Sequence, residues 1–373
     1  MTEPIEPAST AIAAFIGFPE PIPYDDYVVI DSDDFDGWGT DEDAIWGSLH
    51  SSPLRRSLTS FFENGGRTAV AVGVADATLD SVRVGLEALE RVGLVNLLVL
   101  PAESADRPEV REIVAEAAAF CERRRAMLIV DPPGSWTSAA AIQAAMAEGA
   151  EAAVGTASPN AALYAPRIRR SDPAQAGVVD TFAASAAVAG VFARTDASQG
   201  VWAAPAGTDA DLRGADGLEF ELGSRDAEAL NELGISTLRR FSGRPPVVWG
   251  ARTLAGADAA ASEWKYVPVR RMALFLEESI ERGLQWTAFE PNDETLWTAV
   301  RESVGTFLRE LFRAGAFHGN APDRAYFVKC DRETVTQHDL DTGEFTVVVG
   351  FAPIRPAEFV VLRIRALALP PND

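Results

Sequence analysis

Residues 67–100 read RTAVAVGVADATLDSVRVGLEALERVGLVNLLVL and show the clearest structural pattern in the chain. Thr68–Val74 and Leu94–Leu100 are apolar almost throughout at strand length, and Leu79–Val92 carries apolar residues at helical spacing. A strand that is apolar on both faces must be covered on both faces, as in parallel sheets built from βαβ units. The stretch therefore predicts a βαβ unit of a parallel sheet.

The same alternation continues on both sides of this stretch, so we expect an α/β domain. Segments rich in Pro, Asp and Gly separate the apolar runs and indicate loops. The predicted strands are Ala11–Gly17, Ala126–Val130 and Ala161–Ile168, the predicted helices are Pro108–Arg125, Ala139–Glu148 and Val178–Ala193, and the predicted loops are 18–52 and 195–217.

A chain of 373 residues is long for one core, so we expect two domains of about 100–200 residues each. The Gly-Arg-Pro-Pro run that starts at Gly243 marks the boundary. We assign residues 1–20 to an N-terminal arm and first strand that pack with the C-terminal domain. Residues 21–245 then form the α/β domain, and residues 246–373 form a smaller α+β domain.

The C-terminal domain mixes helices and strands. Its longest predicted helix starts after Asn292, which we expect to be the N-cap, and ends at Gly315. In Glu358–Leu367, apolar residues alternate with Arg363 and Arg365, the pattern of a strand with one exposed face. The other predicted elements are a helix at Arg271–Arg282 and strands at Val247–Leu254, Trp264–Val269, Arg324–Cys330 and Glu344–Gly350.

The formal net charge of −22 argues against two classes of partner. Nucleic acid and anionic membrane surfaces both require a cationic face, so we expect neither to bind. No window of the sequence has the ~18 to 20 apolar residues of a membrane span, and the N-terminus has no signal-peptide pattern. Cys121 and Cys330 lie far apart and outside any metal-binding spacing, which indicates reduced, buried thiols.

The sequence lacks the motifs of common catalytic sites. A Ser-His-Asp site needs a histidine base, and His50, His318 and His338 lie in loop-like segments with no GxSxG motif beside them. No GxxxxGK[ST] motif is present, and no GxGxxG motif follows a predicted strand. We therefore expect no enzymatic activity and no cofactor.

One acidic segment leaves a metal site open. Ser32, Asp34, Asp36 and Asp43 approach the spacing of a calcium-binding loop, with Gly37 where the turn must be sharp. The loop departs from that pattern because Ser occupies the first position and Asp replaces the usual bidentate Glu at the last. We favour a solvated acidic loop, and calcium binding is the alternative.

Arginines near the domain boundary could bind an anion or support the fold. We favour framework roles for Arg252, Arg270 and Arg271, because a guanidinium fork pairs well with a carboxylate. Their expected partners are Glu290 and Glu294. Tryptophans at strand ends and on helix faces are expected to pack in the core rather than to form a sugar-stacking platform. These are Trp249, Trp264, Trp286 and Trp297.

Several longer motifs follow one another in a fixed order. They are STAIAAFIG from Ser9, FFENGG from Phe61, AGVFARTDASQGVWAAPAGTDADLRGADG from Ala189, VWGART from Val248, FEPN from Phe289 and PAEFVV from Pro356. In this order they resemble the contractile tail sheath proteins of phages, pyocins and related contractile injection systems, over almost the whole chain.

The resemblance implies a structural subunit rather than an enzyme. Such subunits polymerise as a helical tube of stacked hexameric rings around an inner tube protein, and contraction drives the inner tube through a target envelope. The α/β domain would lie outside, with a doubly wound, subtilisin-like fold, and the C-terminal domain, completed by terminal arms, would form the inner wall. Implied partners are further copies of the chain, the inner tube protein, and baseplate and sheath-terminating proteins. Assembly would take place in the bacterial cytoplasm, and the product would be part of a phage tail or a phage tail-like particle.

The resemblance also implies linkage of subunits by β-augmentation. Removal of Ala357–Asp373 is therefore expected to leave a folded but unassembled subunit. The N-terminal arm is expected to be ordered on a neighbouring subunit and mobile in the free monomer. It comprises Ile5, Glu6, Pro7, Ala8, Ser9 and Thr10. The implied inter-subunit strand comprises Glu358, Phe359, Val360, Val361, Leu362, Arg363, Ile364 and Arg365. The cationic residues expected to contact the inner tube are Arg309, Arg313 and Arg324.

Two alternatives stay open. One is a catalytically inactive, hydrolase-like scaffold or binding protein that does not polymerise. The other is a specialised end-of-sheath paralogue, because only Met1–Thr10 precede the first predicted core strand, whereas sheath proteins often begin with a longer arm.

Overall fold

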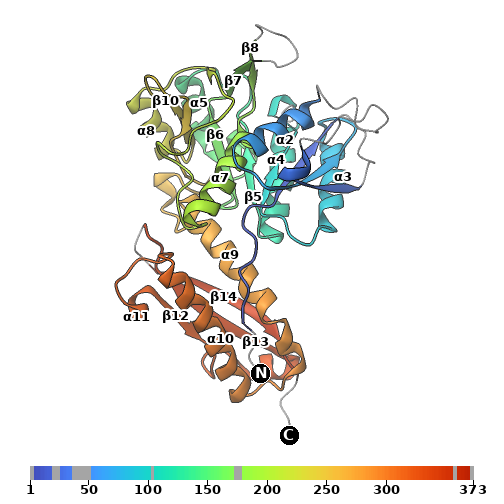
Figure 1. Cartoon of the computed structure of the whole chain (residues 1–373), viewed down its shortest axis with the longest axis vertical. Helices are drawn as coiled ribbons and strands as arrows, with labels where there is room; N and C mark the ends of the chain where they lie inside the picture. The colour runs from blue at the N-terminus through green and yellow to red at the C-terminus, as the bar shows by residue number, and fades with distance from the viewer. Residues whose placement is uncertain are drawn as a thin grey trace. The chain divides into compact units, whose positions relative to one another are not determined.

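The structure is a computed structural model that describes residues 4–18, 26–35, 52–101, 105–171, 179–355 and 359–369. The chain forms two compact units, drawn in Figure 1. The α/β unit comprises Ser9–Gln199 and Ala203–Arg270. The C-terminal unit comprises Met1–Ala8, Gly200–Trp202 and Arg271–Asp373.

An eight-stranded sheet forms the centre of the α/β unit. Its strands are β1 (Ala13–Gly17), β2 (Tyr27–Asp31), β3 (Thr68–Gly73), β4 (Leu97–Val99), β5 (Met127–Val130), β6 (Ala161–Ala165), β10 (Ser236–Arg240) and β11 (Pro246–Val248). They lie in the order β11-β10-β6-β5-β4-β1-β3-β2. The six inner strands pair in parallel, and the edge strands β2 and β11 pair antiparallel with their neighbours. The parallel sheet predicted from the sequence is confirmed.

Helices cover both faces of this sheet. One face packs against α3 (Leu79–Glu90), α4 (Val110–Arg123), α5 (Ala139–Ala145), α6 (Ala150–Val154) and α8 (Ser224–Glu232). The other packs against α2 (Pro53–Glu63) and α7 (Ser185–Gln199), which contact each other in Figure 1. In β1, Ala14 and Ile16 point to the first face and Ala13 and Phe15 to the second. This double burial explains why the strands are apolar at every position.

Two segments of the α/β unit differ from the sequence-based expectation. The predicted loop 18–52 contains the edge strand β2 and a short helix, α1 (Ser32–Phe35). The predicted helix Val178–Ala193 starts instead as a strand, β8 (Val179–Phe182), and α7 begins only at Ser185. β8 joins β7 (Ile168–Ser171) and β9 (Gly217–Leu218) in a second sheet, so tertiary pairing overrides the helical pattern there.

The C-terminal unit contains two long helices and a three-stranded antiparallel sheet. The helices contact each other through Phe275 and Phe307, whose ring centroids lie 6.0 Å apart. The sheet has the order β12-β13-β14. Among the described residues, no helix is both long and apolar enough to span a bilayer. The elements are α9 (Val267–Gly283), η5 (Gln285–Phe289), α10 (Glu294–Arg313), α11 (Pro322–Ala325), β12 (Tyr326–Lys329), α12 (Gln337–Thr342), β13 (Glu344–Phe351) and β14 (Val360–Leu367).

Two details of this region correct the sequence analysis. Trp264–Val269 is not a strand, because only Tyr266 forms an isolated β-bridge and α9 starts at Val267. The N-cap of α10 is Asp293 rather than Asn292, since its Oδ1 accepts the N–H groups at 2.9 and 3.0 Å that begin the helix. The predicted end at Gly315 is confirmed by its positive φ of 83° just after the C-cap.

The boundary between the units lies after Arg270, within α9, and not after residue 245. The turn at Gly243 joins two antiparallel strands, β10 and β11, of the large sheet and so does not separate domains. β1 lies between β4 and β3 of that sheet, which places the first strand in the α/β unit. Of the region 1–20, only Met1–Ala8 belongs to the C-terminal unit.

Candidate assembly surfaces

β14 is an edge strand of the C-terminal unit. It pairs antiparallel with β13 along its whole length. Its side chains alternate between the buried and the exposed face of the sheet, so the half-exposed strand predicted from the sequence is confirmed. The buried side chains are Val360, Leu362 and Ile364, and the exposed ones include Val361, Arg363, Arg365 and Leu367.

Backbone hydrogen bonds beyond β14 show which residues face each edge. The N–H of Ala368 donates to the carbonyl of Gly343, on the β13 side. The N–H of Leu369 donates to the carbonyl of Glu290, and the carbonyl of Leu369 accepts the N–H of Asn292, on the opposite side. Successive residues of an antiparallel strand point their backbone groups to opposite edges. Odd-numbered residues of β14 therefore face away from β13.

The outer edge of β14 is open over its central part. The carbonyl of Leu367 accepts a hydrogen bond from Thr287 Oγ1 at 2.7 Å, which closes one end of the edge. Along the described chain, no other strand pairs with the outward-facing backbone groups of Val361, Arg363 and Arg365. An edge of this kind is a template for an added strand.

The predicted inter-subunit strand belongs to the chain's own sheet in this structure, and its role between subunits stays a prediction. Residues 360–365 form the chain's own β14, and their inner edge is occupied by β13. Phe359 precedes the strand and stacks on Phe327 with centroids 5.9 Å apart, whereas Glu358 lies outside the described residues. A role between subunits can only use the outer edge or an exchange of the whole strand.

The N-terminal arm packs on its own C-terminal unit. Ile5 is 6% exposed and lies against Gly283, where a Cβ atom would come within 2.6 Å of the Ile5 side chain. The N–H of Ala8 donates to Ser279 Oγ of α9 at 3.0 Å. The carbonyl of Ser9 accepts Asn96 Nδ2 at 2.8 Å. In this structure the chain's own α9 provides a packing partner for the arm, and mobility of the arm in the free subunit stays a prediction.

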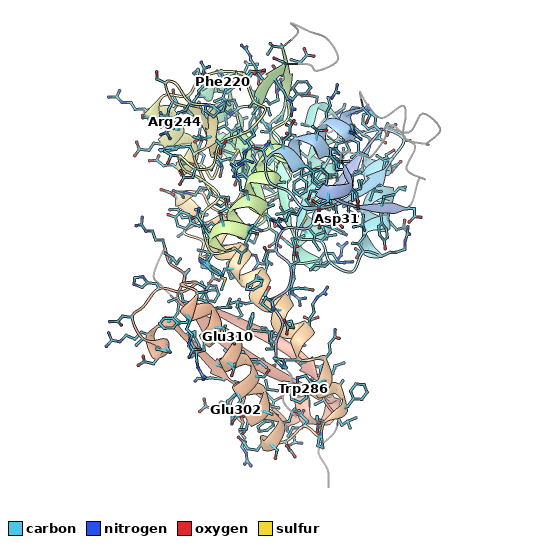
Figure 2. All side chains as sticks on the ribbon, viewed as in Figure 1. Asp31, Phe220, Arg244, Trp286, Glu302 and Glu310 are labelled. Carbon is cyan, nitrogen blue, oxygen red and sulfur yellow. The ribbon has the colours of Figure 1, made fainter. Side chains whose placement is uncertain are left out.

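The residues predicted to contact an inner tube are exposed. Arg309 and Arg313 lie on α10, Arg324 lies on α11, and none forms an ion pair with a described residue. Glu302 and Glu310 are exposed on α10 as well, as Figure 2 shows. The outer surface of α10 therefore carries both signs of charge.

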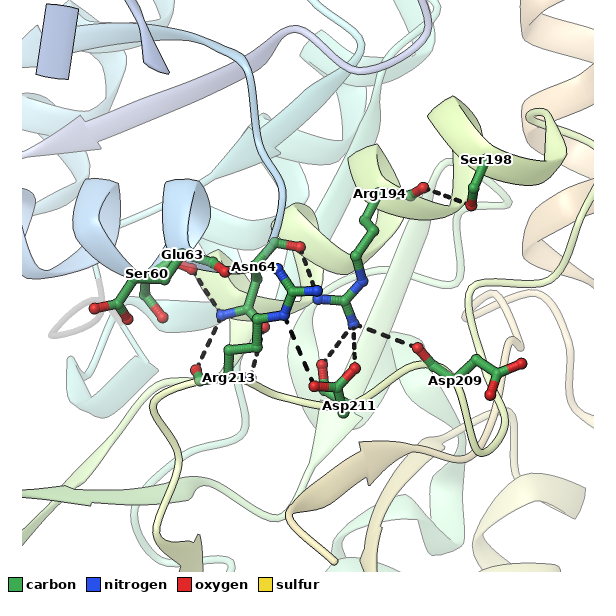
Figure 3. A network of polar contacts seen from close by, with 8 residues as sticks. All are labelled: Ser60, Glu63, Asn64, Arg194, Ser198, Asp209, Asp211 and Arg213. Carbon is green, nitrogen blue, oxygen red and sulfur yellow. Dashed lines mark hydrogen bonds and ion pairs between the residues drawn. The ribbon is translucent and has the colours of Figure 1, made fainter. Parts of the chain in front are cut away.

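The FFENGG motif and the long motif from Ala189 meet at the buried side chain of Asn64. Its Nδ2 donates to the carbonyls of Ser60, at 2.8 Å, and Arg213, at 3.1 Å. Its Oδ1 accepts the N–H of Arg213 at 2.8 Å (Figure 3). One side chain thus joins the end of α2 to a loop about 150 residues away in sequence.

Arg194 of α7 extends this network. Its Nη1 donates to the carbonyl of Asn64 at 3.1 Å, and its Nη2 donates to the carbonyl and the carboxylate of Asp211 at 2.7 and 2.9 Å. A Cβ atom on Gly190 would lie 2.4 Å from the carbonyl of Phe61, so α2 and α7 approach too closely for any larger residue. The two motifs are explained by the close packing of two helices.

We expect Asn64→Ala to lower the free energy of unfolding of the α/β unit by about 3 kcal/mol. The substitution removes the three hydrogen bonds of the Asn64 side chain to Ser60 and Arg213, and each such bond contributes roughly 0.5–1.5 kcal/mol to stability. Urea unfolding followed by circular dichroism measures the change. The control is Ser198→Ala, which removes an exposed hydroxyl bonded to Arg194 and should change stability by less than about 0.5 kcal/mol. Equal effects of the two substitutions would contradict the role of Asn64.

Two of the predicted framework arginines have partners other than those expected. Arg252 Nη1 lies 2.6 Å from Asp258 Oδ1. Arg270 Nε donates to Asn160 Oδ1 at 2.7 Å, and its guanidinium lies over the ring of Trp264 at 4.7 Å. The expected pairing with Glu290 and Glu294 is wrong for both residues, and their framework role stays a prediction.

The expected glutamate partners lie elsewhere. Glu294 pairs with Arg301 at 3.4 Å, and Glu290 is exposed and contributes its backbone carbonyl to Leu369. Arg271, the third predicted framework arginine, is 4% exposed. The sequence could not identify these pairs, because they depend on which loops meet in the folded chain.

The four tryptophans do not share one environment. Trp297 is 5% exposed and its Nε1 donates to Asn292 Oδ1 at 2.8 Å, as expected for the core. Trp249 is 36% exposed and packs edge-on against Phe241, so its expected core position is wrong. It directly follows the edge strand β11, and the guanidinium of Arg239 lies over its ring at 5.6 Å. Trp264 and Trp286 are partly buried.

Asp131 follows β5 and caps α7. Its Oδ1 accepts the N–H groups of Ala184 and Ser185 at 3.1 and 3.0 Å, and its Oδ2 accepts Ser185 Oγ at 2.5 Å. A carboxylate at this position satisfies free N–H groups and interacts favourably with the helix dipole. Desolvation nevertheless outweighs these hydrogen bonds and raises the pKa of Asp131 to about 6.

This pKa shift predicts a pH-dependent stability. A carboxyl whose pKa is raised on folding binds its proton more tightly in the folded state, so its contribution is present at low pH and lost as the pH rises through about 6. Between pH 7.5 and pH 5, wild type should gain on the order of 1 kcal/mol relative to Asp131→Asn. Unfolding midpoints of both proteins across this range measure the difference. Parallel pH profiles would show that Asp131 does not titrate as expected.

The remaining reactive groups do not form a site among the described residues. His318 and His338 are exposed in the C-terminal unit, and His50 lies outside the described residues. Cys121 and Cys330 are free and buried, as expected, and burial raises the pKa of both thiols.

The calcium-loop alternative is not supported at its start. Ser32 and Asp34 lie in the helix α1 instead of a loop, and Asp36 and Asp43 fall outside the described residues. In the described part of the chain, no group of His, Cys, Asp or Glu side chains is arranged to hold a metal ion.

Comparison with known families matches most of the chain. The phage tail sheath protein central domain matches residues 71–254, and the phage tail sheath C-terminal domain matches residues 259–366. A putative prophage major tail sheath protein of Pseudomonas aeruginosa (strain UCBPP-PA14) is 30% identical over 278 residues, which cover 70% of this chain and 62% of that protein. The chain spans between 26% and 62% of the length of the curated relatives it matches.

Solved structures match at nearly full length. The contracted helical sheath of the anti-feeding prophage is 28% identical, with a TM-score of 0.76 over 96% of this chain and 94% of that chain. A chain in the baseplate of the anti-feeding prophage is 26% identical, with a TM-score of 0.74 over 97% of this chain and 94% of that chain.

Proposed function

This chain belongs to the phage tail sheath family, and we propose that it is a structural subunit of a contractile sheath. In this proposal, copies of the chain polymerise as a helical tube around an inner tube protein, and contraction drives that tube through a target envelope. The observation that carries the proposal is the similarity over nearly the whole chain to a sheath subunit in a contracted particle. The subunit is not an enzyme in this role.

The outer edge of β14 supplies the link between subunits. A neighbouring copy adds a strand beside Val361, Arg363 and Arg365, whose backbone groups face outward. When the added strand comes from a different segment than the edge that receives it, the contact is heterologous and can continue from copy to copy as an open helix. The N-terminal arm, held on α9 in the structure, is the segment that exchanges to the neighbour on assembly.

Contraction requires two packings of nearly rigid subunits that differ in free energy. The buried core of each unit keeps the subunit intact, while linking strands and arms change their path. The energy is stored when the sheath assembles. Stacked hexameric rings, association with baseplate and sheath-terminating proteins, and assembly in the bacterial cytoplasm belong to this proposal.

The finer fold description is also part of the proposal. The sheet of the α/β unit, covered on both faces, is taken as a doubly wound, subtilisin-like fold in the outer layer. The C-terminal unit, completed by terminal arms, forms the inner wall. A fold of this kind confers no activity by itself.

Negative-stain electron microscopy of the purified protein tests the function. We expect striated tubes or rings at concentrations in the micromolar range. A protein that stays monomeric under all conditions, with and without an inner tube protein, would favour a scaffold or binding protein that does not polymerise. Capping of tubes made by another sheath protein, without tube growth, would favour an end-of-sheath paralogue.

The contact with the inner tube gives a further prediction. Arg313 is exposed on α10 of an otherwise acidic chain, so it can attract a negatively charged inner tube. We expect Arg313→Glu to reduce co-assembly with the inner tube, and added salt to weaken the wild-type contact, since exposed charges are screened beyond about 8 Å. Co-sedimentation measures both effects. The control is Arg332→Glu, because Arg332 is exposed outside α10. Unchanged co-assembly of Arg313→Glu would remove this residue from the interface.

A further inference from the structure

A polar cavity of about 600 Å³ lies in the α/β unit, at the carboxyl ends of parallel strands. Asp131 directly follows β5, and Arg167 follows β6 after one proline, and both line the cavity. The first turn of α2 and the start of α7 line it as well. In open α/β sheets, the crevice outside the carboxyl ends of the strands is the usual place for a ligand. Nothing in the assembly surfaces described above uses this cavity.

The cavity lining is rich in arginine, although the chain as a whole is acidic. Four arginines line the cavity against three aspartates, whereas the whole chain carries a net charge of −22. The low-dielectric walls of a cleft focus the electric field of the charges that line it, so these local charges matter more for a bound ligand than the net charge of the chain. The lining arginines are Arg55, Arg56, Arg167 and Arg170, and the lining aspartates are Asp106, Asp131 and Asp180.

Two of the four arginines are already neutralised. Arg167 forms a two-pronged pair with Glu219 at 3.1 and 3.0 Å, and it lies 3.8 Å from Asp106. Arg170 pairs with Glu63 at 2.8 Å. Among the lining aspartates, Asp106 and Asp131 accept hydrogen bonds from backbone N–H groups, and Asp180 is exposed on β8. The other two lining arginines belong to α2: Arg55, whose guanidinium lies over the ring of Phe35 at 4.5 Å, and Arg56.

Arg56 has no acidic partner in the described structure. Its guanidinium lies over the ring of Phe182 at 5.5 Å, which orients the group and leaves its N–H donors without a described acceptor. Ser57 and Thr59, which carry hydroxyl groups, line the same cavity. Together they offer the donors that an oxyanion requires.

The first turn of α2 departs from the usual preference for acidic residues at the start of a helix. This turn carries Arg55 and Arg56 and no acidic residue. Cations are unfavourable at the positive end of a helix dipole, whereas an anion is favourable there. Breaks of a local rule are expected where function compensates for them. An anion bound next to Arg56 would offset the unfavourable placement.

We propose that this cavity binds an oxyanion, a carboxylate or a phosphate group, through Arg56 and the hydroxyl groups beside it. The oxyanion is either a free small polyanion or an acidic side chain of a second copy of this chain. Both sources present the same chemistry to Arg56, so the test needs one experiment for each source.

The first experiment uses the purified subunit and does not depend on assembly. Isothermal titration calorimetry with sodium pyrophosphate and with a tricarboxylate, at constant ionic strength in sodium chloride, should show saturable binding to one site. Arg56→Gln should weaken binding about tenfold or more with an unchanged melting temperature, because a charge-assisted hydrogen bond is lost. The matched control is Arg169→Gln, which removes an exposed cation from β7 outside the cavity and should change affinity less than twofold.

The second experiment uses assembled tubes. Hydrogen exchange of residues 53–60 should slow on assembly of wild type and not of Arg56→Gln if the oxyanion comes from a second copy. Equal exchange in subunit and tube, together with pyrophosphate binding, identifies a free polyanion as the ligand. The site is refuted if neither probe binds and assembly gives no protection, or if Arg169→Gln weakens binding as much as Arg56→Gln does. If no tubes form, the calorimetry on the purified subunit still decides whether the cavity binds an oxyanion. Failure of the proposed sheath function and failure of the proposed site can therefore be distinguished.

Discussion

Arg363→Pro is expected to abolish tube formation and to leave the subunit folded. Arg363 lies on β14 with its side chain exposed, and its N–H faces the outer edge, away from β13. Proline removes that N–H, and the ladder within the chain loses no hydrogen bond. Proline is tolerated on edge strands for this reason, so the cost to the subunit is small. An added strand from a neighbouring copy, by contrast, would lose a hydrogen bond in the middle of the new ladder.

The matched control is Arg363→Ala, which removes the same side chain and keeps the N–H. Electron microscopy and analytical ultracentrifugation of the two variants separate a backbone effect from a side-chain effect. Tubes should form with alanine and not with proline, and both subunits should melt within a few degrees of wild type. Normal tubes from Arg363→Pro would mean that the outer edge of β14 is not the link and that subunits exchange whole strands or arms instead.

Removal of residues 357–373 is expected to unfold the C-terminal unit. This reverses the expectation from the sequence, where the same segment looked dispensable for folding. Val360, Leu362 and Ile364 are 4%, 3% and 3% exposed, and burial of each such side chain stabilises by about 1.5–3 kcal/mol. The lost strand also leaves the whole inner edge of β13 unpaired. These losses are comparable to the total stability of a domain, about 5–15 kcal/mol.

Limited proteolysis and near-ultraviolet circular dichroism distinguish the two outcomes. The α/β unit has its own core on both faces of its sheet, so its fragment should resist protease after the truncation. The control is a truncation after Leu369, the last described residue, which bonds to the 290–292 segment; this truncation should keep the native signal. A compact, protease-resistant C-terminal unit in the longer truncation would show that β14 is dispensable and that the sheet closes without it.

The pattern in residues 67–130 was enough to predict the parallel sheet. Each strand there is apolar at every position because its two faces meet different helices, and burial on both faces leaves a signature that needs no tertiary knowledge. Several helix ends were predictable within a few residues, because caps such as Gly315 act through local backbone geometry. The sequence also predicted which side chains of β14 are buried and which are exposed, because successive residues of a strand point to opposite faces of the sheet.

Predictions from the local sequence pattern failed at several places. Val178–Ala193 looked helical throughout, yet its first part pairs with β7, because a strand partner that arrives from elsewhere can outweigh propensity. Asp131, which caps α7 from β5, carries no signal near the helix that it caps. Asn64 and Arg56 were not singled out, since nothing adjacent in sequence distinguishes a buried network or a cavity lining from an ordinary surface.

The sequence by itself determined the fold class, the order of most elements and the family, because these depend on periodicity and on motifs that are local in the chain. Only the tertiary structure decided that β14 completes the chain's own sheet, that the arm lies on α9, and which partners Arg252 and Arg270 contact. The physical reason is the same in each case. A strand edge, an arm and a guanidinium each have several chemically equivalent partners along the chain, and the choice among them depends on which groups folding brings within a few ångströms.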